Sequence, residues 1–167
     1  MENFFNLVKI LSEGLGTTLL IFILTLVLGI PVGILIAMAR NSKNKILSNI
    51  TKLYILIIRG TPMMLQIIFI YFAPYYLFKI NYDRFVAIII AFVVNYAAYF
   101  AEIFRSGILS IPKGQKEAAF TLGFSKTQTF FRILLPQIIK RILPAMSNEV
   151  ISLIKTTSLA QIIGITE

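Results

Sequence analysis

Residues 117–136 read EAAFTLGFSKTQTFFRILLP and predict two short helices joined by a tight turn. The first half is rich in good helix formers, and Gly123 stands where a left-handed C-terminal cap is expected, because glycine has no Cβ. Ser125 is a suitable N-cap for the second helix, and Gln128, three residues later, completes a capping box. Pro136 has no N–H, so we expect a break or kink there.

This predicted hairpin is basic and lies between two apolar segments. Its positive side chains, and those that follow it, are Lys126, Arg132, Lys140 and Arg141. A short, stiff, basic hairpin between membrane spans has a shape that can dock on a soluble partner. An ordinary amphipathic hairpin is the alternative from the residues alone.

The composition is that of a membrane protein. Hydrophobic residues make up 57% of the 167 residues and charged residues only 14%, whereas a soluble domain has about 25% charged residues. The formal net charge of +9 would suggest nucleic acid in a soluble protein. Because the basic residues cluster in loops between long apolar segments, membrane topology explains them better, and no nucleic acid is expected.

Several classes of chemistry are excluded by missing residue types. The chain has no cysteine and no histidine, so neither a thiol metal site nor a histidine general base is available. No G-x-x-x-x-G-K-[ST] loop is present, so any ATP must be hydrolysed by another chain. We therefore expect no catalytic residue, no metal and no cofactor.

Four apolar segments are each long enough, at about 20 residues, to cross a bilayer. They predict an all-α membrane protein, a helical bundle with transmembrane helices at about 14–39, 53–78, 85–104 and 142–164, in one domain covering 1–167. Basic residues crowd the loop at 40–52 and the segment 105–141. By the positive-inside rule both are cytoplasmic, which puts the N-terminus outside.

Small and polar residues interrupt these spans. Gly29 and Gly33 form a G-x-x-x-G pair that favours close helix contact, although a kink at Pro31 is the simpler interpretation. Arg59 precedes Gly60, Thr61 and Pro62 in the second span and can extend to the interface. Four further polar side chains are expected at membrane depth, where such groups are candidates for a substrate path: Asn95, Glu102, Glu149 and Lys155. They could equally hold the spans together as polar pairs.

The hairpin resembles the cytoplasmic signature of the permease subunits of bacterial ABC importers. That signature is Glu-Ala-Ala, three residues, Gly, nine residues, Ile-x-Leu-Pro, and the matching positions here are Glu117, Ala118, Ala119, Gly123, Ile133, Leu135 and Pro136. Further blocks are similar to the polar amino acid importers: residues 59–62 with Gln66, residues 98–105, and residues 154–159.

The resemblance implies the following assembly. Two permease subunits pair as a homodimer or heterodimer in the bacterial cytoplasmic membrane, and an external binding protein delivers the amino acid. Two ATP-binding subunits each receive one cytoplasmic hairpin, here 110–136, and the hairpins carry the motion of the ATPases to the spans. The expected function is ATP-driven import of a polar amino acid, in contact with membrane lipid.

This sequence departs from the family in one respect. Family permeases have five spans, whereas this chain stops at Glu167, where an outer loop would begin. It is expected to be a fragment or a natural truncation. The alternative function is therefore a structural or regulatory membrane subunit without transport activity.

Overall fold

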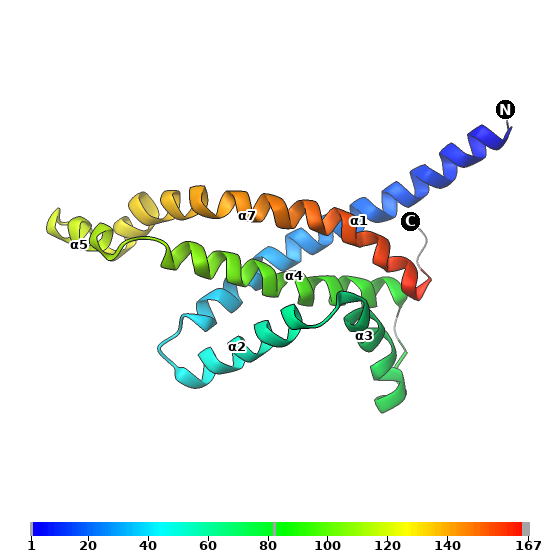
Figure 1. The fold of residues 1–167 in the computed structure, drawn as a ribbon, viewed down its shortest axis with the longest axis horizontal. Helices are drawn as coiled ribbons and strands as arrows, with labels where there is room; N and C mark the ends of the chain where they lie inside the picture. The colour runs from blue at the N-terminus through cyan, green and yellow to red at the C-terminus, as the bar shows by residue number, and fades with distance from the viewer. Residues whose placement is uncertain (1, 82, 165–167) are drawn as a thin grey trace.

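The computed structural model describes residues 2–81 and 83–164, and the regular structure in these ranges is helical (Figure 1). The order of elements is α1 Glu2–Arg40, α2 Lys45–Gly60, α3 Met63–Phe78, α4 Arg84–Leu109, α5 Lys113–Thr121, α6 Lys126–Gln128, the π-helix η1 Thr129–Leu134, α7 Leu135–Thr156 and the 3-10 helix η2 Thr157–Ile163. The all-α fold predicted from composition is confirmed.

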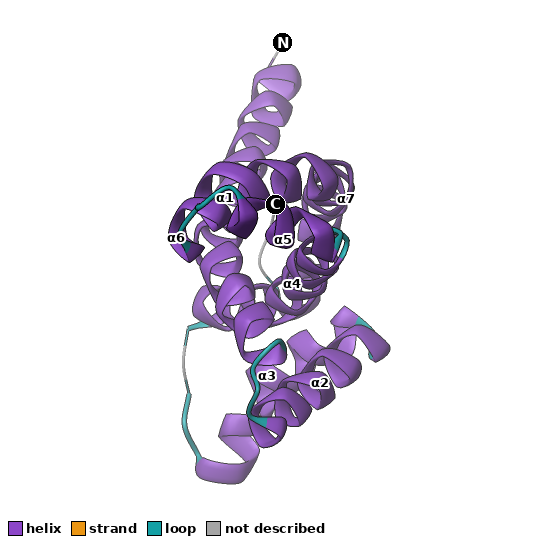
Figure 2. Cartoon of the chain, turned by 90° about the vertical axis from the view of Figure 1, so that its left-hand side faces the viewer, coloured by secondary structure: helices purple, strands orange, loops and turns teal. Residues whose placement is uncertain are grey.

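Helix α4 is the centre of the bundle. It packs against α1, α2, α3 and α7, and its buried side chains include Phe92, Tyr96 and Phe100. Seen end-on, α1, α4 and α7 lie together, while α2 and α3 lie to one side of them (Figure 2). Because α4 is apolar and small-residue-rich around much of its circumference, it can be covered from several sides at once.

The glycine pair in α1 lies against α4. A Cβ added at Gly33 would meet Phe100 Cβ at 2.8 Å and the carbonyl oxygen of Ala97 at 3.2 Å, and one at Gly29 would meet the Phe100 ring at 3.4 Å. Helix α1 runs on through Pro31. The G-x-x-x-G pair therefore serves close helix contact. A kink at Pro31, the interpretation that seemed simpler from the sequence, is not needed to explain the pair.

Among the described residues, two helical segments are long and apolar enough to cross a membrane, Gly14–Arg40 and Arg84–Leu109. Helices α2 and α3 pass the same test only together, and they are bent by 109° at the break between them. The span predicted over 53–78 therefore contains a bend and stays a prediction. The bend arises because Pro62 cannot continue the α2 hydrogen bonds and restricts Thr61 to extended geometry.

The predicted count of four spans is not confirmed. The segment 142–164 is not among the apolar candidates. It comprises most of α7 followed by η2, and Glu149 and Lys155 lower its hydropathy. The third predicted span, 85–104, lies within α4, which continues five residues further to Leu109.

Of the break or kink expected at Pro136, the break does not occur. Helical residues follow one another without a gap from Lys126 through α6, η1 and α7 to Thr156. Pro136 lies in the first turn of α7, directly after the π-helix η1, and this wider turn accommodates a residue that has no N–H to donate. The second half of the hairpin is therefore the start of a long helix that runs into the bundle.

Candidate functional site

Polar side chains hold the break between α2 and α3 in place. Gln66 Nε2 donates hydrogen bonds to the carbonyl oxygens of Ile58 (2.8 Å) and Thr61 (3.1 Å) and to Thr61 Oγ1 (2.8 Å). Asn95 Nδ2 on α4 donates to Gln66 Oε1 at 2.8 Å. Gln66 and Asn95 are both buried. These bonds satisfy backbone carbonyls that the broken helix leaves open.

A pocket of about 300 Å³ lies beside this break. Three helices meet around it: the break supplies Thr61 and Met63, α4 supplies Asn95, Tyr96 and Tyr99, and α7 supplies Glu149, Ser152 and Thr156. Glu149 carries the one carboxylate in this lining, and it is half-buried. The volume is at the lower end for small-molecule pockets, and a few polar groups converge on it from different elements.

The N-terminus of α3 adds partial positive charge at the same place. Met63 begins α3 and lines the pocket, and Pro62 at the N-cap makes no side-chain capping bond. The first N–H groups of a helix lack partners within the helix, and the helix dipole places partial positive charge there. The pocket therefore offers a site for an anion at α3 and a site for a cation at Glu149.

The four polar residues predicted for a substrate path do not form one site. Asn95 and Glu149 line the pocket at the break. Glu102 instead forms an ion pair with Arg105, one turn along α4 (Nε to Oε2, 2.9 Å), and lines a different cavity. Lys155 is exposed on α7 and lines neither.

Sequence reasoning missed most of the lining. Ser152 comes three residues after Glu149, and Thr156 comes four residues after Ser152. Tyr99 comes four residues after Asn95, so each set shares a helix face. That spacing was a usable signal. Thr61 and Met63 had no such signal, because their place depends on the bend between α2 and α3.

The hairpin has the cap geometry that its sequence predicts. Gly123 has φ +78°, the Gly123 N–H donates to Phe120 O and the Phe124 N–H donates to Ala119 O, each at 3.0 Å, which is a Schellman motif. The predicted capping box is confirmed: Ser125 Oγ accepts from Gln128 N at 3.2 Å, and Gln128 Oε1 accepts from Ser125 N at 2.9 Å.

The hairpin projects from one end of the bundle (Figure 1). Of the signature positions, Glu117, Ala118, Gly123 and Pro136 are exposed, Ile133 and Leu135 are half-buried, and Ala119 is buried. Large apolar side chains are exposed beside them: Phe120, Leu122, Phe130 and Phe131. A groove of about 290 Å³ lies between Lys116, Phe120, Lys126, Thr129, Phe130 and Leu134. Exposed apolar side chains beside basic ones are typical of a protein-binding surface.

Residues 29–166 match the family described as binding-protein-dependent transport system inner membrane component. The L-cystine transport system permease protein TcyB of Bacillus subtilis is 42% identical over 158 residues, which are 95% of this chain and 67% of that protein. The glutamine transport system permease protein GlnP of Escherichia coli K12 is 39% identical over 161 residues, 96% of this chain and 74% of that protein.

Two solved structures are similar over almost the whole chain. A crystal structure of an amino acid ABC transporter with histidines superposes with a TM-score of 0.89 at 34% identity, covering 99% of this chain and 77% of that one. An inward-facing MetNI methionine ABC transporter superposes with a TM-score of 0.70 at 22% identity, covering 95% and 76%. The second likeness concerns the fold alone.

Proposed function

The chain belongs to the family of binding-protein-dependent transport system inner membrane components, and we propose that it holds a polar amino acid in the pocket at the α2–α3 break while importing it. It is a membrane-embedded permease subunit of an amino acid ABC importer, as its permease relatives and its structural neighbour are. A structural subunit without transport activity is not favoured by these likenesses.

The observation that carries the proposal is the arrangement of opposite charges in one pocket. An amino acid presents an ammonium and a carboxylate a few ångströms apart. The Glu149 carboxylate suits the ammonium, and the N-terminus of α3 at Met63 suits the carboxylate. Interrupted membrane helices that face a ligand with their N-terminal ends are a recurring design of transporters. Asn95 and Thr61 then hold the break in shape around the ligand.

Uptake by a Glu149→Gln variant tests this assignment. The permease and its partner subunits are expressed in a strain that lacks the corresponding importer, and uptake of a panel of labelled polar amino acids is measured. We expect the variant to lose at least about tenfold in uptake, because a hydrogen bond to a charged group is worth about 1.5–3 kcal/mol. Asn148→Ala is the matched control, since Asn148 is exposed on the same helix and lies outside the pocket lining. Equal uptake by Glu149→Gln and wild type, at equal membrane abundance, would contradict the assignment.

We also propose that ATP is hydrolysed by a separate subunit that receives the hairpin, two such subunits serving a pair of permeases, with an external binding protein delivering the amino acid. Glu117, Ala118, Ala119 and Gly123, together with Ile133, Leu135 and Pro136, are the proposed coupling residues. The exposed apolar side chains, the groove and the continuous helix from Lys126 to Thr156 support this role.

The proposed orientation places the hairpin in the cytoplasm and the N-terminus outside. The turn between α1 and α2 lies toward the same end of the molecule as the hairpin, and the α3–α4 connection lies toward the opposite end (Figure 1). Arg40, Lys43 and Lys45 crowd that turn. Two basic segments at one end agree with the positive-inside rule.

A Gly123→Pro variant tests coupling. Proline holds φ near −65°, whereas this position needs φ +78°, so the turn cannot close as it does in the wild type. We expect ATP hydrolysis by the assembled importer to continue while uptake falls. Unchanged uptake at equal membrane abundance would contradict a coupling role for the hairpin.

A further inference from the structure

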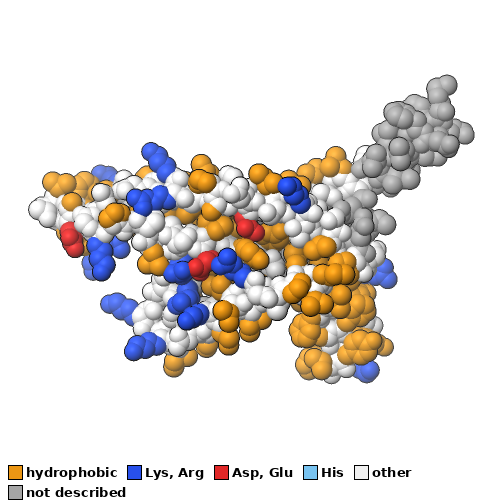
Figure 3. All heavy atoms as spheres, viewed as in Figure 1, with side chains coloured by type: hydrophobic (Ala, Val, Ile, Leu, Met, Phe, Trp, Pro, Cys, Tyr) orange, Lys and Arg blue, Asp and Glu red, His pale blue; other side chains and the backbone are white. Residues whose placement is uncertain are grey.

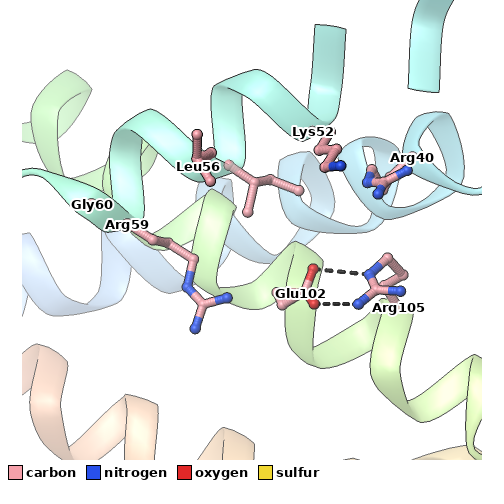
Figure 4. Close-up of a pocket in the computed structure, with 8 residues that line it drawn as sticks. Arg40, Lys52, Leu56, Arg59, Gly60, Glu102 and Arg105 are labelled. Atoms are coloured by element: carbon pink, nitrogen blue, oxygen red, sulfur yellow. Dashed lines mark hydrogen bonds and ion pairs between the residues drawn. The ribbon is translucent and has the colours of Figure 1, made fainter. Parts of the chain in front are cut away.

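A second cavity, of about 470 Å³, lies between α1, α2 and α4. Four basic side chains line it, with one carboxylate and a short apolar wall: Arg40, Lys52, Arg59, Arg105, Glu102, Ile55 and Leu56, together with Gly60. Figure 4 shows the side chains of Arg40, Lys52, Arg59 and Arg105 arranged around the space beside Glu102. This cavity is distinct from the pocket at the break and contains none of its lining residues.

The positive charges in this cavity exceed the negative ones. Glu102 is held by both Nε and Nη2 of Arg105. Arg40 Nη1 donates to Ser48 Oγ at 2.7 Å, and Arg59 lies over the Tyr99 ring at 5.1 Å from its centre. Among the described residues neither arginine forms an ion pair, although Glu102 attracts both of them and Glu149 attracts Arg59. Lys52 forms no ion pair within the described ranges. The lining itself therefore carries four basic groups and one carboxylate, an excess of three positive charges.

The surroundings of the cavity make that excess costly without an anion. Ile55 is buried in its wall, and α2 exposes Leu53, Leu56 and Ile57 on its outer surface. Charges of one sign repel more strongly beside such apolar groups than in water. The space-filling view shows these basic side chains gathered where α2 meets α4, next to apolar side chains (Figure 3).

We propose that this cavity binds a phosphate group, supplied by the head group of an anionic phospholipid in the leaflet that faces the hairpin. Arginine and lysine side chains bind phosphate oxygens by charge-assisted hydrogen bonds. Arg40 and Arg105 lie near the ends of the candidate spans Gly14–Arg40 and Arg84–Leu109. If these helices cross a bilayer, their ends reach the lipid head groups, and the exposed leucines and isoleucine of α2 would adjoin the acyl chains. Basic pockets between membrane helices on the cytoplasmic side bind anionic head groups in general. The proposal does not depend on which amino acid is transported.

Lipid titration of the purified full chain, in the assembly in which it is extracted, tests the proposal. Phosphatidylglycerol and phosphatidylcholine are added separately to the protein in neutral detergent, and bound lipid is counted by native mass spectrometry. We expect tighter binding of phosphatidylglycerol than of phosphatidylcholine. Lys52→Gln should weaken phosphatidylglycerol binding about fivefold, which is the loss expected for one basic group near an anionic head group. Lys52→Arg should restore it.

The matched control is Lys45→Gln. Lys45 lies two turns before Lys52 on α2 and does not line the cavity, so its neutralisation removes the same charge from the same helix. Equal weakening by Lys45→Gln and Lys52→Gln would overturn the proposal, because it would mean general attraction to a basic surface.

A soluble head group separates the two sources of phosphate. If glycerol phosphate leaves phosphatidylglycerol binding unchanged, the site takes the phosphate as part of a lipid. If glycerol phosphate displaces the lipid from wild type and binds Lys52→Gln more weakly, the phosphate site stands and a free phosphate ester is its ligand. Failure of both compounds to bind wild type would overturn the proposal and leave an acidic group of a partner subunit as the counter-charge.

Discussion

Two of the breaks between helices, the one between α5 and α6 and the one between α2 and α3, are closed by different forces. Between α5 and α6 the turn is closed by its own residues, through the positive φ of Gly123 and the capping box of Ser125 and Gln128. Between α2 and α3 the 109° bend is held by side chains, and Asn95, which comes 29 residues after Gln66, provides the tie to α4.

This difference in how the breaks are closed matches the surroundings of each break. The hairpin projects from one end of the bundle and is mostly exposed, so its backbone groups without a protein partner are accessible from outside and local caps are sufficient. The α2–α3 break is instead closed by the buried amides of Gln66 and Asn95, and a buried polar group without a partner costs much more. A local motif can be transplanted with its sequence, whereas a break held by distant side chains exists only in the folded bundle.

The largest expected effect is that of Gln66→Leu. This change removes the donor to Ile58 O and Thr61 O and leaves the Asn95 amide without its acceptor. We expect a loss of about 2 kcal/mol in the free energy of unfolding, since buried unpaired polar groups cost about 1–3 kcal/mol. Thermal unfolding in detergent measures it. In a double-mutant cycle with Asn95→Leu, a coupling energy of zero would show that the two side chains do not act together.

Gly123→Ala probes the other break. A Cβ at this position would meet no heavy atom within 4 Å, so the substitution tests the positive φ alone, at a cost of about 1–2 kcal/mol. We expect faster hydrogen exchange of the Phe124 amide, which donates to Ala119 O, by about tenfold. Global melting should stay unchanged, because α5 packs mainly against η1. A fall in the global melting temperature as large as that of Gln66→Leu would remove the distinction between the two breaks.

Ser125→Ala should act on the same turn more weakly. It removes the side-chain acceptor of the Gln128 N–H, and the loss of an N-cap costs about 1 kcal/mol. Hydrogen exchange over residues 126–130 is the measurement, with about a fivefold increase expected. Ser125→Asp keeps an acceptor at the N-cap and serves as the control, which should exchange like wild type.

The smallest effect is expected at the glycine of the α2–α3 break. Gly60 ends α2 without a positive φ, and an added Cβ there would meet no heavy atom within 4 Å. Gly60→Ala should therefore raise stability slightly, by about 0.5 kcal/mol, because alanine favours helix over glycine. A loss of stability as large as that expected for Gly123→Ala would mean that this break, too, depends on its own backbone conformation.

The local features of this protein could be predicted from its sequence. Apolar length predicted the membrane helices over 14–39 and 85–104, and the residues around Gly123 predicted both caps of the hairpin. Caps and apolar runs depend on neighbouring residues, so a linear pattern is enough to find them. Asn95 and Glu149 were likewise found by the cost of placing polar groups at membrane depth.

Long-range relations were decided only by the tertiary structure. The sequence marked residues 59–62 as irregular, but the bend and the bond from Asn95 to Gln66 depend on how α4 packs against α3. The same packing separated Glu149 from Glu102 and Lys155, which sequence reasoning had grouped by chemical type. A polar residue in a membrane helix can be expected from the sequence to need a partner, but only the folded chain determines which partner lies within hydrogen-bonding distance.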